Sequence, residues 1–159
     1  MLDLLAEAAT WTRDRGFANW PDRFSRRLIE RNLERDELFV AERAGGTIAT
    51  FALQWSDEFF WGPDDGAAGY VHRLAVRRAV SGDGLGYALL DWAAARVCER
   101  GRRALRLDVV TGNHPLRDYY ARAGFALVRD LTGELTHDDG TRTPWQTSLY
   151  ERACAPAKI

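Results

Sequence analysis

The stretch LAVRRAVSGDGLGYALL at residues 74–90 constrains the fold more than any other part of this chain. It begins within an apolar run, YVHRLAV at 70–76, which predicts a buried strand, and it ends in apolar residues at helical spacing. The predicted helix stops near Gly101, and a further strand-like run, ALRLDVV, covers 104–110. The order of strand, glycine turn, helix and strand predicts a βαβ unit.

Gly82, Gly84 and Gly86 stand where the first of these strands ends and the helix begins. The N–H groups of such a turn, with the free donors and positive dipole end of the helix, form an anion site. A Cβ there would keep a phosphate away from the amides. The same glycines are also explained by a tight turn with positive φ and by close helix packing, and the glycines alone do not separate the two interpretations.

Two common phosphate-binding motifs do not fit this stretch. The letters GDGLG lack the GK[ST] ending of a P-loop, and they depart from the GxGxxG of a dinucleotide fold with its acidic residue about 20 positions on. The strand before the glycines also follows other predicted elements instead of opening the fold. Both nucleotide-binding classes are therefore disfavoured.

The elements around the βαβ unit predict an α+β fold. Apolar spacing predicts a first helix from Leu4 to Thr12 and a second one with the apolar face Phe24, Leu28, Ile29 and Leu33. A Gly-Gly turn predicts a hairpin over roughly 38–55, followed by a loop at 56–69, a short helix at 115–124 and two closing strands at 125–131 and 145–151. With 159 residues and 46% hydrophobic content we expect a single domain over 1–159.

Composition argues against several classes of protein. The 22 Lys and Arg nearly cancel 23 Asp and Glu, and a net charge of -1 gives no reason to expect a nucleic-acid partner. The 2 cysteines, Cys98 and Cys154, form neither a disulfide framework nor a zinc motif, so a reducing cytoplasm is the expected location. No apolar run is long enough for a membrane span, and the N-terminus lacks a secretory pattern.

The glycine turn resembles one motif of the GNAT superfamily of N-acetyltransferases. In that family Gln or Arg, two residues, Gly, one residue, and Gly or Ala bind the pyrophosphate of acetyl-CoA. The matching window here runs from Ser81 to Gly86, with both glycines in place and Ser81 where Gln or Arg would stand. Arg77 or Arg78, at the strand end, is the hypothesised source of the missing charge.

A second motif strengthens the resemblance. The family commonly shows Asn, then Tyr seven residues later, then Gly-Phe after three more, and Asn113, Tyr120, Gly124 and Phe125 fall on that spacing. The two motifs stand in the family's order, with predicted strands on either side. The resemblance therefore covers roughly residues 68–127 well and the rest by element order.

The resemblance implies a central mixed, largely antiparallel sheet with a splayed parallel strand pair and helices on both faces. It implies direct transfer from acetyl-CoA to a primary amine through a tetrahedral intermediate, with no metal. Asn113 would hold the pantetheine chain, and Tyr120 would give a proton to the departing thiolate. The cofactor-binding set that it implies is Leu74, Ala75, Val76, Ser81, Gly82, Asp83, Gly84, Leu85, Gly86, Tyr87, Asn113 and Tyr120.

Structural explanations stand beside these roles. Asn113 next to Pro115 is an ordinary helix start, and Tyr120 can pack on a helix face. The chain also departs from the family, whose domains usually open with a strand: helical spacing begins at Leu4, so the usual first strand is expected to be missing through truncation or replacement by another segment. An exposed edge strand invites pairing, and we expect a homodimer.

The reaction needs a base, because an alkyl ammonium with a pKa near 10.4 is neutral in only about one molecule in a thousand at physiological pH. His72 is the first candidate, because it stands two residues before Leu74 and has an ordinary pKa of about 6.5. Asp108 is the second and Glu58 the third. A packed histidine, an ion-paired Asp108 and a water chain are the alternatives.

The loop SDEFFWGPDD and the bend GFANWP combine aromatic and acidic residues, which suit a cationic amine. The resemblance implies that they form the acceptor pocket, for a small molecule or a protein N-terminus, with Trp20, Trp55, Glu58 and Asp108 as binding residues. A solvated loop pinned by aromatic residues, or a dimer contact, is the alternative. The alternative function, favoured by the Ser81 departure, is a non-catalytic acyl-CoA-binding regulatory module.

Overall fold

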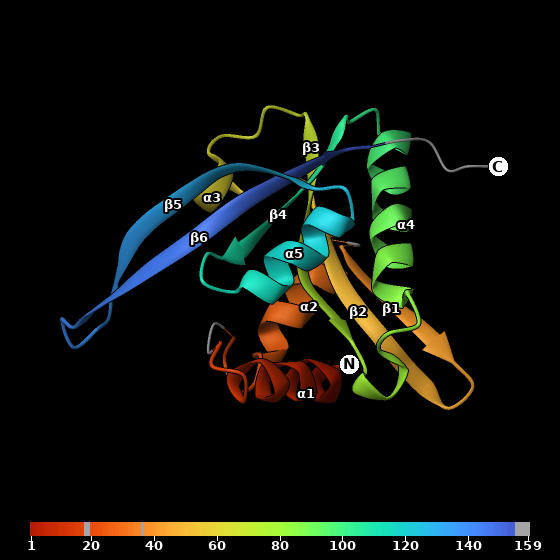
Figure 1. The fold of residues 1–159 in the computed structure, drawn as a ribbon, viewed down its shortest axis with the longest axis horizontal. Coiled ribbons are helices and arrows are strands. Elements are labelled where there is room, and N and C mark those ends of the chain that lie inside the picture. Colours follow the sequence, from red (N-terminus) through yellow and green to blue (C-terminus); the bar gives the residue numbers. More distant parts are fainter. Residues whose placement is uncertain (18–19, 36, 155–159) are drawn as a thin grey trace.

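The computed structural model describes residues 1–17, 20–35 and 37–154. Its centre is a six-stranded sheet of order β1-β2-β3-β4-β6-β5 (Figure 1). The strands are β1 (Leu38–Arg43), β2 (Gly46–Gln54), β3 (Ala68–Val76), β4 (Ala104–Val110), β5 (Ala126–Thr136) and β6 (Arg142–Ala153). The helices are α1 (Leu2–Arg13), α2 (Arg26–Glu34), α3 (Glu58–Trp61), α4 (Leu85–Glu99) and α5 (His114–Arg122), with a 3-10 turn at Arg78–Val80.

The predicted α+β class is confirmed, because β3 and β4 are parallel and the other neighbouring strands are antiparallel. Within the described residues no strand precedes α1, as expected. Two details differ: α3 was expected as loop, and Leu33 is 54% exposed instead of lying on an apolar face. Asp57 explains α3, because its side chain accepts a hydrogen bond from the Phe60 N–H at 3.4 Å.

Parallel pairing joins β3 and β4 along only part of their length. It extends over Ala68–Tyr70 on β3 and Ala104–Arg106 on β4, although the strands run on to Val76 and Val110. Beyond the Tyr70–Arg106 pair the two strands no longer pair with each other. This is the splayed pair that the family resemblance implied, and it opens a gap in the middle of the sheet.

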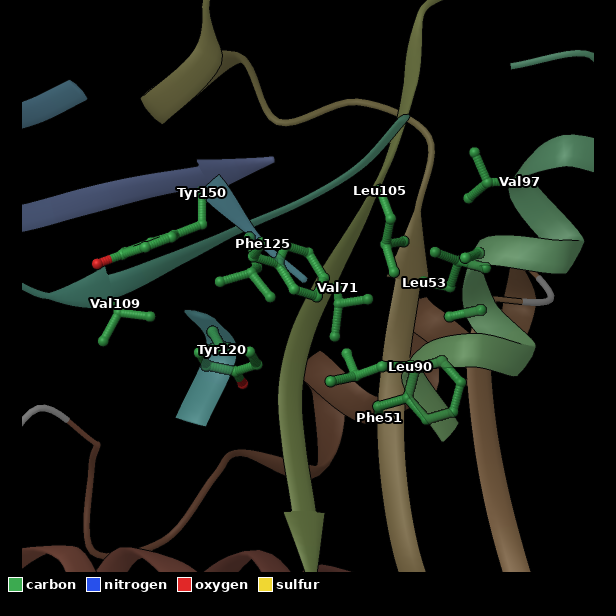
Figure 2. Packing of buried hydrophobic residues seen from close by; sticks show 13 residues of the cluster. Phe51, Leu53, Val71, Leu90, Val97, Leu105, Val109, Tyr120, Phe125 and Tyr150 are labelled. Atoms are coloured by element: carbon green, nitrogen blue, oxygen red, sulfur yellow. The ribbon is translucent and has the colours of Figure 1, made fainter. Parts of the chain in front are cut away.

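Two apolar clusters pack on opposite faces of the sheet. The larger one joins α4 and α5 to the strands and includes Phe51, Leu53, Val71, Leu90, Val97, Leu105, Leu107, Val109, Tyr120, Phe125 and Tyr150 (Figure 2). The smaller one packs Leu4 and Leu5 of α1 and Ile29 of α2 against Ala75 of β3. The helices α1 and α2 therefore wall the face of the sheet opposite α4.

The β5–β6 hairpin (blue in Figure 1) extends away from the rest of the molecule. It is longer than the predicted closing strands, and the ring of Trp145 packs against Phe59 and Phe60 of α3, with ring centroids 5.8 Å apart in both cases.

The single-domain interpretation stays a prediction. In the described part of the chain, none of the helices has both the length and the apolar character needed to span a membrane.

Candidate active site

Two adjoining cavities lie where β3 and β4 separate. The larger, of about 690 Å³, is lined by the glycine turn, the start of α4 and residues of α5 and its N-cap. The smaller, of about 260 Å³, lies between β3, β4 and α1. The residues that line both are Trp11, Thr12, Leu74, Val76, Arg78, Asn113, Leu116 and Tyr120. A ligand in the larger cavity can therefore meet one in the smaller cavity at the gap in the sheet.

The three glycines serve both the turn and the cavity. Gly82 and Gly84 have φ values of 100° and 78°, and Gly84 is the N-cap residue of α4, so the turn needs glycine at both. A Cβ built on either would meet nothing within 4 Å. Gly86 is different: a Cβ there would overlap the hydroxyl oxygen of Tyr119, whose ring is stacked on that of Tyr87 at 4.6 Å.

Arg78 brings positive charge to this site, and Arg77 does not. The Arg77 guanidinium donates to Glu7 Oε2 at 2.9 Å and to the Thr47 carbonyl at 3.2 Å. Arg78 lines both cavities, and its guanidinium lies 4.1 Å from the centroid of the Trp11 ring. Of the two arginines considered in place of Ser81, Arg78 is the one that reaches the cavities.

Asn113 and Tyr120 of the second motif line both cavities. The Oδ1 atom of Asn113 accepts a hydrogen bond from the Leu116 N–H at 3.2 Å, so the helix-cap explanation holds for that oxygen. Burial, and then the neighbouring Tyr119 and Asp108, raises the pKa of Tyr120. The Tyr120 hydroxyl therefore keeps its proton at neutral pH and is available as a donor.

A β-bulge in β3 borders the gap. Thr50 pairs with Ala75 and Ala52 with His72, so two residues of β3, Arg73 and Leu74, lie opposite one residue of β2. Arg73 has a φ of 54°, in the left-handed region that residues other than glycine rarely adopt. A strained conformation of this kind persists only where its surroundings hold it.

A buried polar network holds the bulge through the Arg73 side chain. Arg73 Nη2 donates to Asn32 Oδ1 at 2.6 Å, and Asn32 Nδ2 donates to Glu37 Oε2 at 3.1 Å. Gln54 Nε2 donates to the same Glu37 oxygen at 3.1 Å. Asn32 and Glu37 are buried, so these bonds satisfy groups that water cannot reach. The network fixes the backbone at Leu74 from α2 and β2.

Beside the bulge, His72 lies between two carboxyl groups. Its Nε2 atom is 3.6 Å from Asp57 Oδ2, and its Nδ1 atom is 3.8 Å from Asp108 Oδ1. Alternation explains why His72 and Asp108 meet: their neighbours Val71, Leu107 and Val109 belong to the larger core, so both side chains point to the other face. His72 and Asp108 line the smaller cavity.

Burial shifts the titration of this cluster. Burial, and then the Arg73 charge, lowers the pKa of His72 to about 4, so the imidazole is neutral at pH 7. Burial, and then the Asp57 charge, raises the pKa of Asp108 to about 6. Burial also raises the pKa of Asp57. A carboxyl group that titrates near neutrality, next to a neutral imidazole, can take up and release a proton under physiological conditions.

The structure brings together most, but not all, of the predicted site residues. Trp20 and Asp108 line the smaller cavity, whereas Trp55 and Glu58 line neither one. Trp55 packs against the larger core, and Glu58 is exposed on α3. Of the predicted cofactor residues, Ala75 is buried under α1, and Asp83 is exposed and does not line the larger cavity; the other ten line it.

Sequence reasoning missed Trp11 of α1 and Arg15, two residues after that helix ends, which both line the larger cavity. It also missed that Asp57 lies next to His72. The spacing of α1 predicted its buried face, but no motif marks its cavity-facing side. In the sequence, Asp57 stands among the other acidic residues of its loop. Only the neighbouring aromatic residues of that loop hinted that it folds back onto the sheet.

A sheet that splays at one parallel pair, with a glycine-lined cavity at the gap, defines the fold class of the GNAT acetyltransferases. The sequence model of the Acetyltransferase (GNAT) family matches residues 5–125. The chain belongs to this family and is an N-acetyltransferase.

Two relatives illustrate the similarity. The chain is 33% identical over 135 residues to the uncharacterized N-acetyltransferase YesJ of Bacillus subtilis (strain 168), covering 79% of this chain and 74% of that protein. A GNAT acetyltransferase from Listeria monocytogenes has a similar fold, with a TM-score of 0.71, 24% identity, and coverage of 95% of this chain and 86% of that one.

A third relative, a GNAT acetyltransferase from Elizabethkingia anophelis whose structure contains acetyl-CoA, gives a TM-score of 0.60 at 17% identity, covering 81% of this chain and 83% of that one. At 24% and 17% identity, the similarity to these two solved structures is one of fold.

Proposed function

We propose that this protein transfers the acetyl group of acetyl-CoA directly to a primary amine of a small molecule or protein N-terminus. The two adjoining cavities are the observation that supports the proposal. The larger one suits the cofactor, and the smaller one is lined by His72 and Asp108, which can exchange protons with an amine. Arg15, Arg78 and Arg122 line the larger cavity and suit a ligand rich in phosphate. The open backbone at Gly82 and Gly84 leaves room for a pyrophosphate.

Bound acetyl-CoA supplies a thioester, and the chain's own residues supply position and proton transfer. Leu74, at the bulge, lines both cavities, and in this proposal a backbone amide near it would polarise the thioester carbonyl. The amine nitrogen attacks the carbonyl carbon, a tetrahedral intermediate forms, and the C–S bond then breaks. The ammonium form of the acceptor loses two protons overall: Tyr120 delivers one to the thiolate, and the base at His72 and Asp108 passes the other to solvent.

The acceptor pocket in this proposal is the smaller cavity, with Trp20 and Asp108 from the predicted set and His72 as base. An ionised Asp108 attracts an ammonium group, and Trp20 offers an aromatic surface to it. We leave Trp55 and Glu58 out of the pocket. A homodimer through the edge strands β1 or β5 stays a prediction, which the mass in solution tests.

The decisive experiment measures thermal unfolding with and without acetyl-CoA, with matched arginine variants. Arg78 and Arg100 each lie over a tryptophan ring, at 4.1 and 4.2 Å, but only Arg78 lines the cavities. We expect Arg78→Ala to weaken acetyl-CoA binding about tenfold, as for loss of a hydrogen bond to a charged group, and Arg100→Ala to leave it unchanged. Equal effects of the two variants would contradict the assigned cavity.

Turnover is then tested by release of free thiol with a panel of amines. Tyr120→Phe should bind acetyl-CoA and lose most of its turnover, because the hydroxyl proton is gone while the ring remains. Binding of acetyl-CoA without thiol release from any amine would favour the regulatory-module alternative. No binding at millimolar acetyl-CoA would refute the proposed function.

A further inference from the structure

We propose that Asp57 is a positioning residue for His72: it accepts the Nε2 proton of the imidazole, and so leaves Nδ1 to act with Asp108 on the acceptor amine. The inference rests on the proposed function and extends it to a residue outside both cavities. It concerns which ring nitrogen carries the proton, and why.

The buried Nε2 atom of His72 requires a hydrogen-bond partner, and the Asp57 carboxyl group lies next to it. His72 Nε2 and Asp57 Oδ2 are both inaccessible to solvent, face each other at 3.6 Å, and have no hydrogen-bond partner within the described residues. If neither atom carried a proton, two acceptors would face each other where no water can separate them. A proton on Nε2 satisfies both atoms once a small closure shortens the distance, as happens when catalytic hydrogen bonds tighten around a substrate.

The other ring nitrogen faces the chemistry. His72 Nδ1 lies 3.8 Å from Asp108 Oδ1, and both residues line the smaller cavity together with Tyr120. Asp57 does not line that cavity. The groups thus follow one another from the cavity inward: Asp108, the imidazole, and Asp57 behind it. This order matches the pairing of a catalytic base with a buried orienting carboxylate.

The imidazole and Asp108 have three charged or titratable neighbours, Arg73, Asp57 and Tyr120. Arg73 is next to His72 on β3, Asp108 stands on β4, Asp57 comes from the loop before α3, and Tyr120 of α5 lies near Asp108. The Asp57 charge is the second cause, after burial, that raises the pKa of Asp108 to about 6. Removing that charge should therefore shift the acidic side of the pH–rate profile, where activity is lost on acidification, to lower pH.

The proton transfer balances within this set. His72 Nδ1, or Asp108 next to it, accepts one proton from the acceptor ammonium while Nε2 keeps its own. The imidazolium that forms is stabilised by the carboxylates on its two sides. Release of the proton to water in the cavity restores the neutral ring in its starting tautomer. No oxidant, reductant or metal takes part.

The test uses Asp57→Asn in the full chain. Asparagine keeps an oxygen that can accept from the Phe60 N–H, so the cap of α3 survives while the carboxylate is lost. We expect kcat to fall about 10-fold to 100-fold and the KM for acetyl-CoA to stay constant. We also expect the acidic side of the pH–rate profile to lie at lower pH than in the wild type. Asp138→Asn, an exposed control in the β5–β6 turn, should change none of these.

A second measurement does not depend on turnover. Nitrogen-15 NMR of histidine-labelled protein reports the tautomer of each of the 3 histidines, and His72→Gln assigns the signal. We expect wild-type His72 at pH 7 to carry its proton on Nε2 and Asp57→Asn to lose this preference. A proton on Nδ1 in the wild type, or an unchanged tautomer in the variant, would overturn the inference.

The two proposals fail in different ways. If no amine is acetylated, the proposed function fails, and the tautomer measurement still decides the role of Asp57. If turnover is found and Asp57→Asn lowers kcat without moving the acidic side of the pH–rate profile or the tautomer, Asp57 is only structural and the proposed function stands.

Discussion

Gly86 and Tyr119 form a contact whose energy can be measured by a double-mutant cycle. A Cβ at Gly86 would overlap the Tyr119 hydroxyl oxygen, and the next atom, ring carbon Cζ, would lie at 3.4 Å, an ordinary contact. The Tyr119 ring is held by stacking on Tyr87 and edge contact with Tyr120, so it cannot easily swing away. Gly86→Ala should therefore cost about 1–3 kcal/mol through overlap, offset by up to about 1 kcal/mol of helix propensity.

In a Tyr119→Phe background the overlapping oxygen is gone, and Gly86→Ala should become neutral or stabilising. The coupling energy between the two substitutions is then about 1–3 kcal/mol. Urea denaturation of the four proteins measures it, with acetyl-CoA binding followed in parallel because both residues line the larger cavity. A coupling energy below about 0.5 kcal/mol would refute the claim that Tyr119 is why this position is glycine.

Two further predictions concern the second motif and the titrating cluster. Asn113→Ala should lose about 1 kcal/mol of stability because the α5 cap is lost, whereas Asn113→Asp keeps the accepting oxygen and should be about as stable as wild type. If both variants raise the KM for acetyl-CoA, the side-chain amide binds the cofactor. If only Asn113→Ala raises the KM, the side chain matters only as the helix cap. Because the folded-state pKa of Asp108 is raised from 3.8 to about 6, its contribution to stability is complete below about pH 4 and is lost as pH rises through about 6, by up to about 3 kcal/mol. Denaturation should therefore show Asp108→Asn gaining stability relative to wild type between about pH 4.5 and pH 7.5, and a pH-independent difference would contradict the shift.

The sequence predicted the βαβ unit and the hairpin because each carries its own local signal. Strand alternation, helical spacing and glycine turns all act over a few residues, so 70–76, 85–101 and 104–110 were located closely. The ends of β5 and β6 were not located, because residues such as Thr132, Glu134 and Arg142 are exposed. Their strand structure comes from backbone pairing between β5 and β6, which hydropathy does not reveal. The sequence did not predict α3 within the loop at 56–69, because a helix of four residues is too short to show a helical repeat of apolar residues.

The candidate site was predictable where side chains follow the strand period. Tyr70 pairs with Arg106, and two residues further on the same face stand His72 and Asp108. Asp57 was not predictable as their neighbour, because its place depends on how a loop between β2 and β3 folds back onto the sheet. Trp55, only two residues earlier, points into the larger core instead, which no local pattern distinguishes.

The short pairing between β3 and β4 divides the sheet into two half-sheets, β1–β3 and β4–β6, joined by three residue pairs. Each half-sheet presents backbone donors and acceptors along an inner edge beyond the Tyr70–Arg106 pair. A ligand seated in the gap therefore acts as a mechanical brace between them, and amide exchange along both inner edges should slow together when it binds. The gap proposed to admit the ligand lies beside the strand pair with the fewest residue pairs in the sheet, so a bound ligand should make the protein more rigid.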